Sequence, residues 1–281
     1  MITLHSDKII ISKDECFDPK AIFECGQVFR YTCSNDVYTV YAGDYCATVI
    51  EQGDCYEILT SNVDYFYTYF DLATDYNMII ESIKDKPLMK ESLIFGKGLR
   101  ILRQEHFENI ISFIISANNN VPRIKGIIER IAKSLGAFHG SYYGFPTVKI
   151  MANQSEEFYK SLGAGYRASY LLSTAKAIDY GFDINSLEKL DTQNAKRELL
   201  KLKGIGSKVA DCILLFSYSR KDVFPVDTWI KKVYGRLCNN EECVEKMREY
   251  LIDLYGEYAG YAQQYLFYSH RSSNGATISI N

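Results

Sequence analysis

A lysine and an aspartate lie nineteen residues apart, each at the start of a predicted helix. Lys208 follows a Gly-x-Gly turn at 204–206, and Asp227 follows a Pro-Val pair. In the first turn of a helix, the helix dipole disfavours the charged form of an amine. An uncharged amine is a nucleophile that can form a Schiff base, and a nearby carboxylate can stabilise positive charge on a substrate. The two residues could therefore act together as a covalent catalyst.

The turn before Lys208 joins two helical patterns within about 195–219. Glycines permit such a tight turn because they lack Cβ, and we expect Ser207 to cap the second helix, which runs to about Ser219. Backbone N–H groups at a helix start bind anions, of which a DNA phosphate is the obvious example. The pattern predicts a helix–hairpin–helix. The turn alone is weak evidence, because it also precedes ordinary surface lysines, but the spacing to Asp227 strengthens the catalytic interpretation.

The helix predicted after this turn has two faces. Val209, Ile213 and Phe216 recur at helical spacing and are expected to face the core. Cys212 lies four residues after Lys208, on the same face. Two interpretations of Cys212 are open. Its thiolate could pair with the ammonium of Lys208 and recognise a substrate dipole, or it could be a buried structural thiol.

Several segments resemble a known family. The run Gly-Ile-Gly-Ser-Lys-Val-Ala-Asp-Cys at 204–212, followed by Pro-Val-Asp at 225–227, resembles the helix–hairpin–helix DNA glycosylase superfamily. It is most similar to the 8-oxoguanine DNA glycosylases of the eukaryotic type. Further matching segments are Gly-Gln-Val-Phe-Arg at 26–30, Asn-Asn-Asn-Val-Pro-Arg at 118–123, Gly-Tyr-Arg-Ala at 165–168, and 258–267. The resemblance extends over about 17–267.

The resemblance implies a base-excision DNA repair enzyme that removes 8-oxoguanine opposite cytosine from duplex DNA. Such an enzyme must flip the damaged base out of the helix. Lys208 would attack C1′ of the sugar and form a Schiff base, Asp227 would support the charge on the sugar, and an AP-lyase step would cleave the strand. Neither a cofactor nor a metal ion is expected.

The resemblance also implies which residues hold the extruded base. The carbonyl of Gly26 would accept the N7 proton that 8-oxoguanine has and guanine lacks. Gln263 would bond the Watson–Crick edge, and Phe267 would stack on the purine. From the residues alone, Gly26 would be a turn glycine and Phe267 a core residue. The substrate-binding group is completed by Cys212, Phe216 and Pro225.

A second group implied by the resemblance contacts the rest of the duplex. Asn118, Arg123 and Arg167 would contact the orphaned cytosine. Tyr166 would wedge into the base stack and offset part of the cost of unstacking. The hairpin contacts to the phosphates would come from Lys203, Gly204 and Gly206.

The expected fold class is α+β. An N-terminal antiparallel sheet domain of the TBP-like kind is expected in 1–100, followed by a mainly α-helical glycosylase domain in 101–281. β-Branched and aromatic runs between turn residues predict strands at 8–12, 27–31, 37–41, 45–51 and 55–59. Apolar periodicity predicts helices at 63–83, 107–117, 122–135 and 228–238, and a pair within 247–269. Residues 84–98 are expected to form a connector, and the tail at 271–281 is expected to be loosely held.

The charge distribution is consistent with a DNA-binding enzyme when the two parts of the chain are counted separately. The net charge is -3, but residues 1–80 hold 4 basic and 13 acidic side chains, whereas the remainder holds 28 and 22. The DNA-facing surface should therefore lie in the second part. None of the eight cysteines forms a CxxC pair, so a zinc site is not expected. Without a signal or membrane-spanning pattern, we expect an intracellular monomer, nucleoid-associated in a bacterium or nuclear in a eukaryote.

Three alternatives remain open at this stage. An alkylated-base glycosylase of the same superfamily would rely on the aspartate alone, so Lys208 argues against it. An adenine glycosylase of the iron–sulfur type is weaker, because its C-terminal cysteine cluster is missing. A non-catalytic helix–hairpin–helix DNA-binding protein would need neither Asp227 nor a pocket helix at 258–267.

Overall fold

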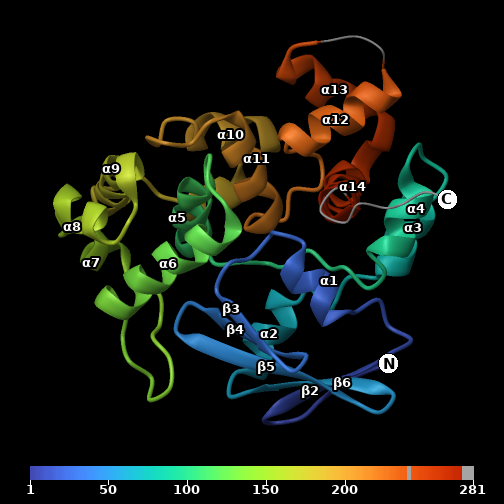
Figure 1. The fold of residues 1–281 in the computed structure, drawn as a ribbon, viewed down its shortest axis with the longest axis horizontal. Coiled ribbons are helices and arrows are strands. Elements are labelled where there is room, and N and C mark those ends of the chain that lie inside the picture. The colour runs from blue at the N-terminus through green and yellow to red at the C-terminus, as the bar shows by residue number, and fades with distance from the viewer. Residues whose placement is uncertain (239–241, 274–281) are drawn as a thin grey trace.

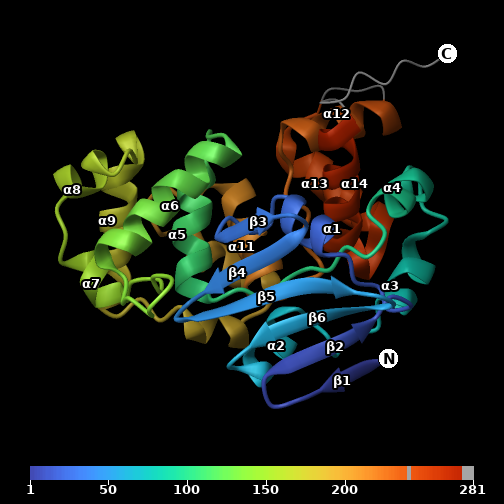
Figure 2. The ribbon, with the colours of Figure 1, turned by 60° about the horizontal axis from the view of Figure 1, so that its bottom comes forward.

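The structure is a computed structural model that describes residues 1–238 and 242–273. A six-stranded antiparallel sheet forms one side of the molecule, and most of the helices form the other (Figure 1, Figure 2). One hydrophobic core buries a face of the sheet under α1 (Pro19–Glu24) and α2 (Val63–Tyr69). A second, larger core lies among the helices. The predicted α+β class is confirmed.

The sheet is a meander whose first hairpin packs beside its last strand. Strand alternation explains this arrangement, because every second side chain of β2 and β4 is buried. Asn35 and Asp36 both have positive φ, which suits the tight turn between β3 and β4. The strands lie in the order β1 (Ile2–Leu4), β2 (Lys8–Ser12), β6 (Cys55–Thr60), β5 (Tyr45–Gln52), β4 (Val37–Ala42) and β3 (Tyr31–Ser34).

The strand predicted at 27–31 is wrong, because β3 begins only at Tyr31. The side chains before it bond across the molecule instead of facing a sheet. Gln27 is fully buried and donates to the carbonyls of Ile22 and Arg100 at 2.9 and 2.7 Å. Arg30 pairs with Glu108 at 3.1 Å. These contacts hold the segment as a loop that runs between the two cores.

The helical part contains one series of α-helices joined by loops. No helix in the described part of the chain is both long and apolar enough to cross a membrane. The helices that follow α2 are α3 (Tyr76–Ile83), α4 (Met89–Phe95), α5 (His106–Ser116), α6 (Val121–Leu135), α7 (Val148–Ala152), α8 (Glu156–Ser161), α9 (Ala168–Asp179), α10 (Thr192–Leu199), α11 (Ser207–Phe216), α12 (Thr228–Leu237), α13 (Val244–Tyr255) and α14 (Ala259–Ser273).

Four helix predictions need correction. The pattern at 63–83 forms two helices, because Asp71 takes a positive φ and Asp75 caps α3. The connector predicted at 84–98 contains α4. Of the tail predicted to be loosely held, residues 271–273 belong to α14, and residues 274–281 lie outside the described residues. The N-cap of α11 is Gly206, not Ser207, and the helix ends at Phe216, not near 219.

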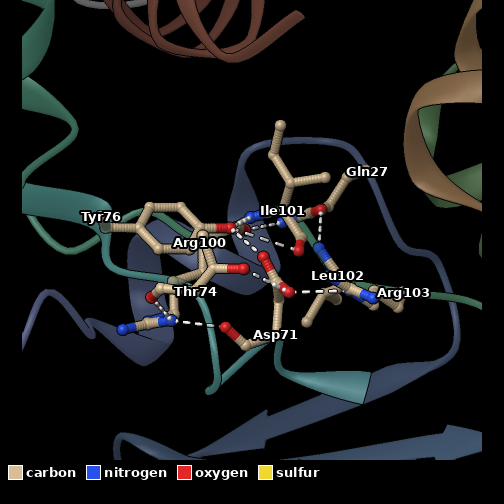
Figure 3. A network of polar contacts seen from close by, with 8 residues as sticks. All are labelled: Gln27, Asp71, Thr74, Tyr76, Arg100, Ile101, Leu102 and Arg103. Carbon is tan, nitrogen blue, oxygen red and sulfur yellow. Dashed lines mark hydrogen bonds and ion pairs between the residues drawn. The ribbon is translucent and has the colours of Figure 1, made fainter. Parts of the chain in front are cut away.

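A buried polar network joins the two cores along 99–104 (Figure 3). Arg100 is only 2% exposed, and its guanidinium lies 4.4 Å from the ring centroid of Tyr76. It donates to the carbonyls of Cys16 and Asp71 at 2.5 and 2.7 Å. The amide of Gln27 bonds the backbone of the same segment, accepting from Leu102 at 2.8 Å. Because these buried groups are paired, the segment is held firmly. The loop that carries residue 26 is thereby fixed to both cores. The domain division at residue 100 stays a prediction.

Candidate active site

The predicted catalytic pair and the predicted base-binding residues line one pocket. The pocket is partly open to solvent and lies where α11, α14, the loop before α12 and the loop at residue 26 meet. All eight catalytic and substrate-binding residues named from the sequence are in its wall. The lining residues are Gly26, Phe113, Lys208, Cys212, Phe216, Pro225, Asp227, Gln263, Gln264 and Phe267.

Lys208 lies in the first turn of α11 and reaches the pocket with its amine. Its Nζ lies 5.6 Å from the ring centroid of Phe113, so the amine faces an aromatic wall. The start of this helix is held from two sides. Arg248 donates to Oγ of Ser207 at 2.8 Å, and buried Asp211 accepts from Lys196 at 2.5 Å. These contacts fix the turn that carries the nucleophile.

Asp227 caps α12 and presents a carboxylate to the same pocket. Its Oδ1 accepts from the backbone N–H groups of Trp229 and Ile230, both at 2.9 Å. Both bonds use one oxygen, and they fix the side chain at the helix start. The second oxygen is left to interact with a bound molecule. These two hydrogen bonds therefore hold the carboxylate in one position.

Cys212 lies one turn after Lys208 and is buried in the pocket wall. Burial raises the pKa of the Cys212 thiol, and the neighbouring Lys208 offsets only part of that effect. The thiol is therefore protonated near neutral pH. This favours the interpretation of Cys212 as a buried thiol over that of a thiolate–ammonium pair.

The wall formed by α14 contains a polar atom without a partner. Gln263 is 4% exposed, and its Oε1 makes no hydrogen bond within the described protein. Its neighbour Gln264 is also buried but donates to the carbonyl of Cys25 at 3.0 Å. A buried unpaired polar atom costs free energy, so its presence in a pocket is a sign of ligand binding.

Gly26 faces Phe267 across the pocket. Its φ is +86°, a conformation that glycine adopts far more easily than other residues. A Cβ atom at this position would lie 3.2 Å from Cε1 of Phe267 and 2.6 Å from Nη1 of Arg271. The backbone conformation therefore favours glycine, and a side chain at this position would require the end of Arg271 to move.

The residues expected to contact the opposite strand gather at the end of α5. Asn118 takes a positive φ directly after α5, in the loop that precedes α6. Tyr166 is 53% exposed, and its hydroxyl donates to the carbonyl of Ala117 at 3.3 Å. Arg123 is exposed and donates to the carbonyl of Gly163 at 3.3 Å. The structure thus brings these three predicted residues to one surface.

Arg167 differs from its neighbours because its guanidinium is buried. It is 2% exposed and donates from Nε and Nη2 to the carbonyl of Ala117, at 2.9 and 2.5 Å, and from Nη2 to that of Asn118 at 2.7 Å. In this conformation it supports the loop after α5. Contact with a cytosine would have to use its remaining nitrogen, Nη1, and stays a prediction.

The hairpin lies beside this surface. Gly204 has φ +92°, and a Cβ there would lie 2.7 Å from the ring of Tyr170. The amine of Lys203 lies 5.8 Å from the same ring centroid, and Tyr166 packs against Tyr170 edge to face. Gly206 caps α11 without a side-chain hydrogen bond. The backbone N–H groups at the start of α11 therefore remain available beside the exposed hairpin.

Sequence reasoning missed three residues at or near the pocket. Phe113 lies in an apolar helix pattern that is indistinguishable from core. Gln264 is next to Gln263, but only tertiary structure shows that it bonds Cys25. Arg271 was assigned to a loose tail, although its position eight residues after Gln263 places it on the same helix face. Among the described residues, no cluster of His, Cys, Asp and Glu could hold a metal ion.

Comparison with known proteins identifies close relatives. The family model "HhH-GPD superfamily base excision DNA repair protein" matches residues 111–256, and that of the "8-oxoguanine DNA glycosylase, N-terminal domain" matches residues 8–110. The chain is 34% identical over 233 residues to the probable N-glycosylase/DNA lyase of Methanothermobacter thermautotrophicus, covering 73% of each protein. It is also 34% identical over 202 residues to an N-glycosylase/DNA lyase of Arabidopsis thaliana, which is 66% of this chain and 55% of the plant protein.

A solved structure extends the similarity over nearly the whole chain. The 8-oxoguanine glycosylase/lyase of Clostridium acetobutylicum, in complex with double-stranded DNA containing cytosine opposite 8-oxoguanine, matches with a TM-score of 0.92. Sequence identity is 38%, and the match covers 98% of both chains.

Proposed function

The chain belongs to the HhH-GPD superfamily of base-excision DNA repair proteins and, within it, to the 8-oxoguanine glycosylases, and we propose that the pocket between Lys208 and Gln263 is where it excises 8-oxoguanine. Members of this family are bifunctional N-glycosylase/lyases, and the chain is an enzyme of that kind. One observation carries the assignment of the site. A nucleophile, a fixed carboxylate and a buried unpaired amide oxygen line the same small pocket.

Lys208 is the proposed nucleophile. Its Nζ forms a bond to C1′ of the deoxyribose while the bond from C1′ to the base breaks, and the base leaves after taking up a proton. The resulting aminal opens to a Schiff base. Loss of a proton from C2′ then expels the 3′ phosphate, which cleaves the strand. The lysine thus serves both the glycosylase and the lyase step.

Asp227 is proposed to stabilise the positive charge that grows on the sugar as the glycosidic bond weakens. Its contribution depends on position, and the two hydrogen bonds from the start of α12 supply that position. Because these bonds use only Oδ1, Oδ2 would interact with the charge on the sugar. A fixed carboxylate needs little reorganisation when the charge develops.

The base is proposed to lie between the loop at Gly26 and α14. Guanine-type bases offer N–H donors on the Watson–Crick edge, which suit the unpaired Oε1 of Gln263. The carbonyl of Gly26 would accept the N7 proton that distinguishes 8-oxoguanine from guanine. Phe267 would stack on the purine. Cys212, Phe216 and Pro225 complete the wall.

The duplex is proposed to contact the surface formed by the hairpin and the loop after α5. Tyr166 would enter the base stack, and Asn118 and Arg123 would contact the cytosine left behind. Phosphates would bind the N–H groups at the start of α11, beside Lys203, Gly204 and Gly206. Arg167 would hold the loop and offer Nη1 to the cytosine. All of these groups come from one chain, so we propose that the protein acts as a monomer in the compartment that holds the DNA.

Excision on a set of duplexes tests this proposal. The purified protein is incubated with duplexes that contain 8-oxoguanine, 3-methyladenine or no lesion, each opposite its usual partner, and base release and strand cleavage are measured separately. We expect release of 8-oxoguanine with cleavage at the same site. Release of 3-methyladenine alone would instead indicate an alkylated-base glycosylase, and binding without release would indicate a non-catalytic module.

A further inference from the structure

Arg271 lies directly behind the proposed base pocket without lining it. Its guanidinium carbon is 5.2 Å from the ring centroid of Phe267, within the range of a cation–π contact. Arg271 faces a neighbouring groove together with Lys20 and Tyr31, whereas Phe267 faces the pocket. The arginine therefore touches the stacking ring from outside the pocket.

The same guanidinium holds the opposite wall. Its Nη2 donates to the backbone carbonyl of Glu24, two residues before Gly26. Gln264, also on α14, donates to the carbonyl of Cys25 at 3.0 Å. Two side chains of one helix thus bind two consecutive carbonyls at the C-terminal end of α1, directly before Gly26. Both bonds lie within two residues of Gly26.

Arg271 also fills the space that a side chain on residue 26 would need. A Cβ atom on this residue would lie 2.6 Å from Nη1 and 3.6 Å from Cζ of Arg271. The glycine and the arginine are therefore matched to each other. Gln263, Phe267 and Arg271 are spaced by four residues along α14, so they form one stripe on the helix.

We propose that Arg271 is a positioning residue for lesion recognition, which clamps the loop at 24–26 to α14 and thereby sets the separation between the carbonyl of Gly26 and the ring of Phe267. This inference rests on the proposed function of the pocket. A planar guanidinium suits the task, because it can donate hydrogen bonds in its plane while it contacts a ring with its face. Arg271 does not line the pocket that contains Lys208, so we expect the lyase chemistry on a site that already lacks its base to be independent of it.

The experiment compares two reactions in the same protein preparation. Single-turnover excision is measured on a duplex with 8-oxoguanine opposite cytosine, and strand incision on the same duplex with an abasic site in place of the lesion. The variants are Arg271→Met, which keeps an unbranched side chain but lacks the guanidinium and its hydrogen-bond donors, and Arg271→Lys, which keeps the positive charge. Lys20→Met is the control, because it removes a positive charge from the same groove.

We expect Arg271→Met to slow excision about tenfold, the effect of one lost hydrogen bond to a charged group. Incision at the abasic site should stay at the wild-type rate, and Arg271→Lys should recover only part of the excision. Lys20→Met should match the wild type in both reactions. Equal losses in both reactions of Arg271→Met, or a similar loss in Lys20→Met, would show a general stability or DNA-binding effect and overturn the inference.

The proposed function can fail separately. If the wild type excises no 8-oxoguanine, the proposed function falls and this inference falls with it. If the wild type excises 8-oxoguanine and Arg271→Met excises it equally fast, the inference alone is overturned.

Discussion

Gln263 and Gln264 are neighbours on α14 whose replacement should change stability in opposite directions. They are 4% and 2% exposed. Oε1 of Gln263 has no partner among the described residues, whereas Gln264 donates to the carbonyl of Cys25 at 3.0 Å. A buried polar group without a partner costs about 1–3 kcal/mol. We therefore expect Gln263→Met to raise the free energy of unfolding by about 1 kcal/mol, and Gln264→Met to lower it by about the same amount.

Gln263→Met should lower the rate of excision although it raises the stability. The methionine has no acceptor oxygen for the N–H groups of the base, so at least one hydrogen bond in the bound state is lost. A loss of about 1.4 kcal/mol corresponds to a tenfold lower rate. We expect Gln263→Met to be more stable than the wild type and to excise 8-oxoguanine at least about tenfold more slowly.

Thermal unfolding and single-turnover excision measure the two effects. For a chain of this size, 1 kcal/mol shifts the melting temperature by about 2 °C. The reasoning would be refuted if Gln263→Met melted below the wild type by as much as Gln264→Met does. It would also be refuted if Gln263→Met excised 8-oxoguanine at the wild-type rate, because the unpaired oxygen would then have no role in binding the base.

Three further predictions follow from the same pocket. Gly26→Ala should strongly slow excision while incision at an abasic site persists, because the backbone conformation disfavours alanine and Arg271 would have to move away from the new Cβ. Loss of incision together with excision would contradict this. Burial raises the pKa of the Cys212 thiol, so Cys212 should react with iodoacetamide more slowly than exposed Cys243 at pH 8. The reaction rate of Cys212 should increase only as the pH rises above the usual range of thiol pKa values. Peptide mass spectrometry measures both rates, and equal rates would argue against a protonated thiol. Tyr166→Ala should slow excision from duplex DNA by roughly tenfold or more, since stacking contributes about 1–3 kcal/mol. Loss of the contacts with Ala117 and Tyr170 should lower the melting temperature only slightly, and an unchanged excision rate would exclude a wedge role.

The sequence predicts most of the pocket because the chemistry resides in short motifs. Lys208 and Asp227 each follow a turn that begins a helix, so their local positions can be derived from capping rules and helix periodicity. Gln263 and Phe267 share a helix face for the same reason. Tertiary packing brings these two pairs together in one pocket. The family resemblance predicts this meeting, whereas helix periodicity alone cannot.

Three of the errors in prediction share one physical cause. Residues 27–30 have the composition of a strand, but Gln27 and Arg30 bond to distant groups and hold the segment as a loop. Arg271 bonds Glu24, which is distant in sequence. Its other partner, Phe267, is four residues away, but the sequence pattern makes Phe267 look like a core residue. Tertiary hydrogen bonds override local preference in both places, and no local pattern records them. The capping of α11 by Gly206 has the same origin, because Ser207 binds Arg248 instead.

We expect Lys208 to become covalently attached to the sugar from which 8-oxoguanine is removed. Borohydride reduces a Schiff base to a stable amine, so the protein is incubated with a duplex containing 8-oxoguanine opposite cytosine in its presence, and the adduct is digested and mapped by mass spectrometry. We predict one adduct, on residue 208, that is absent from Lys208→Gln. An adduct on another lysine, or release of 8-oxoguanine without any adduct, would contradict this prediction.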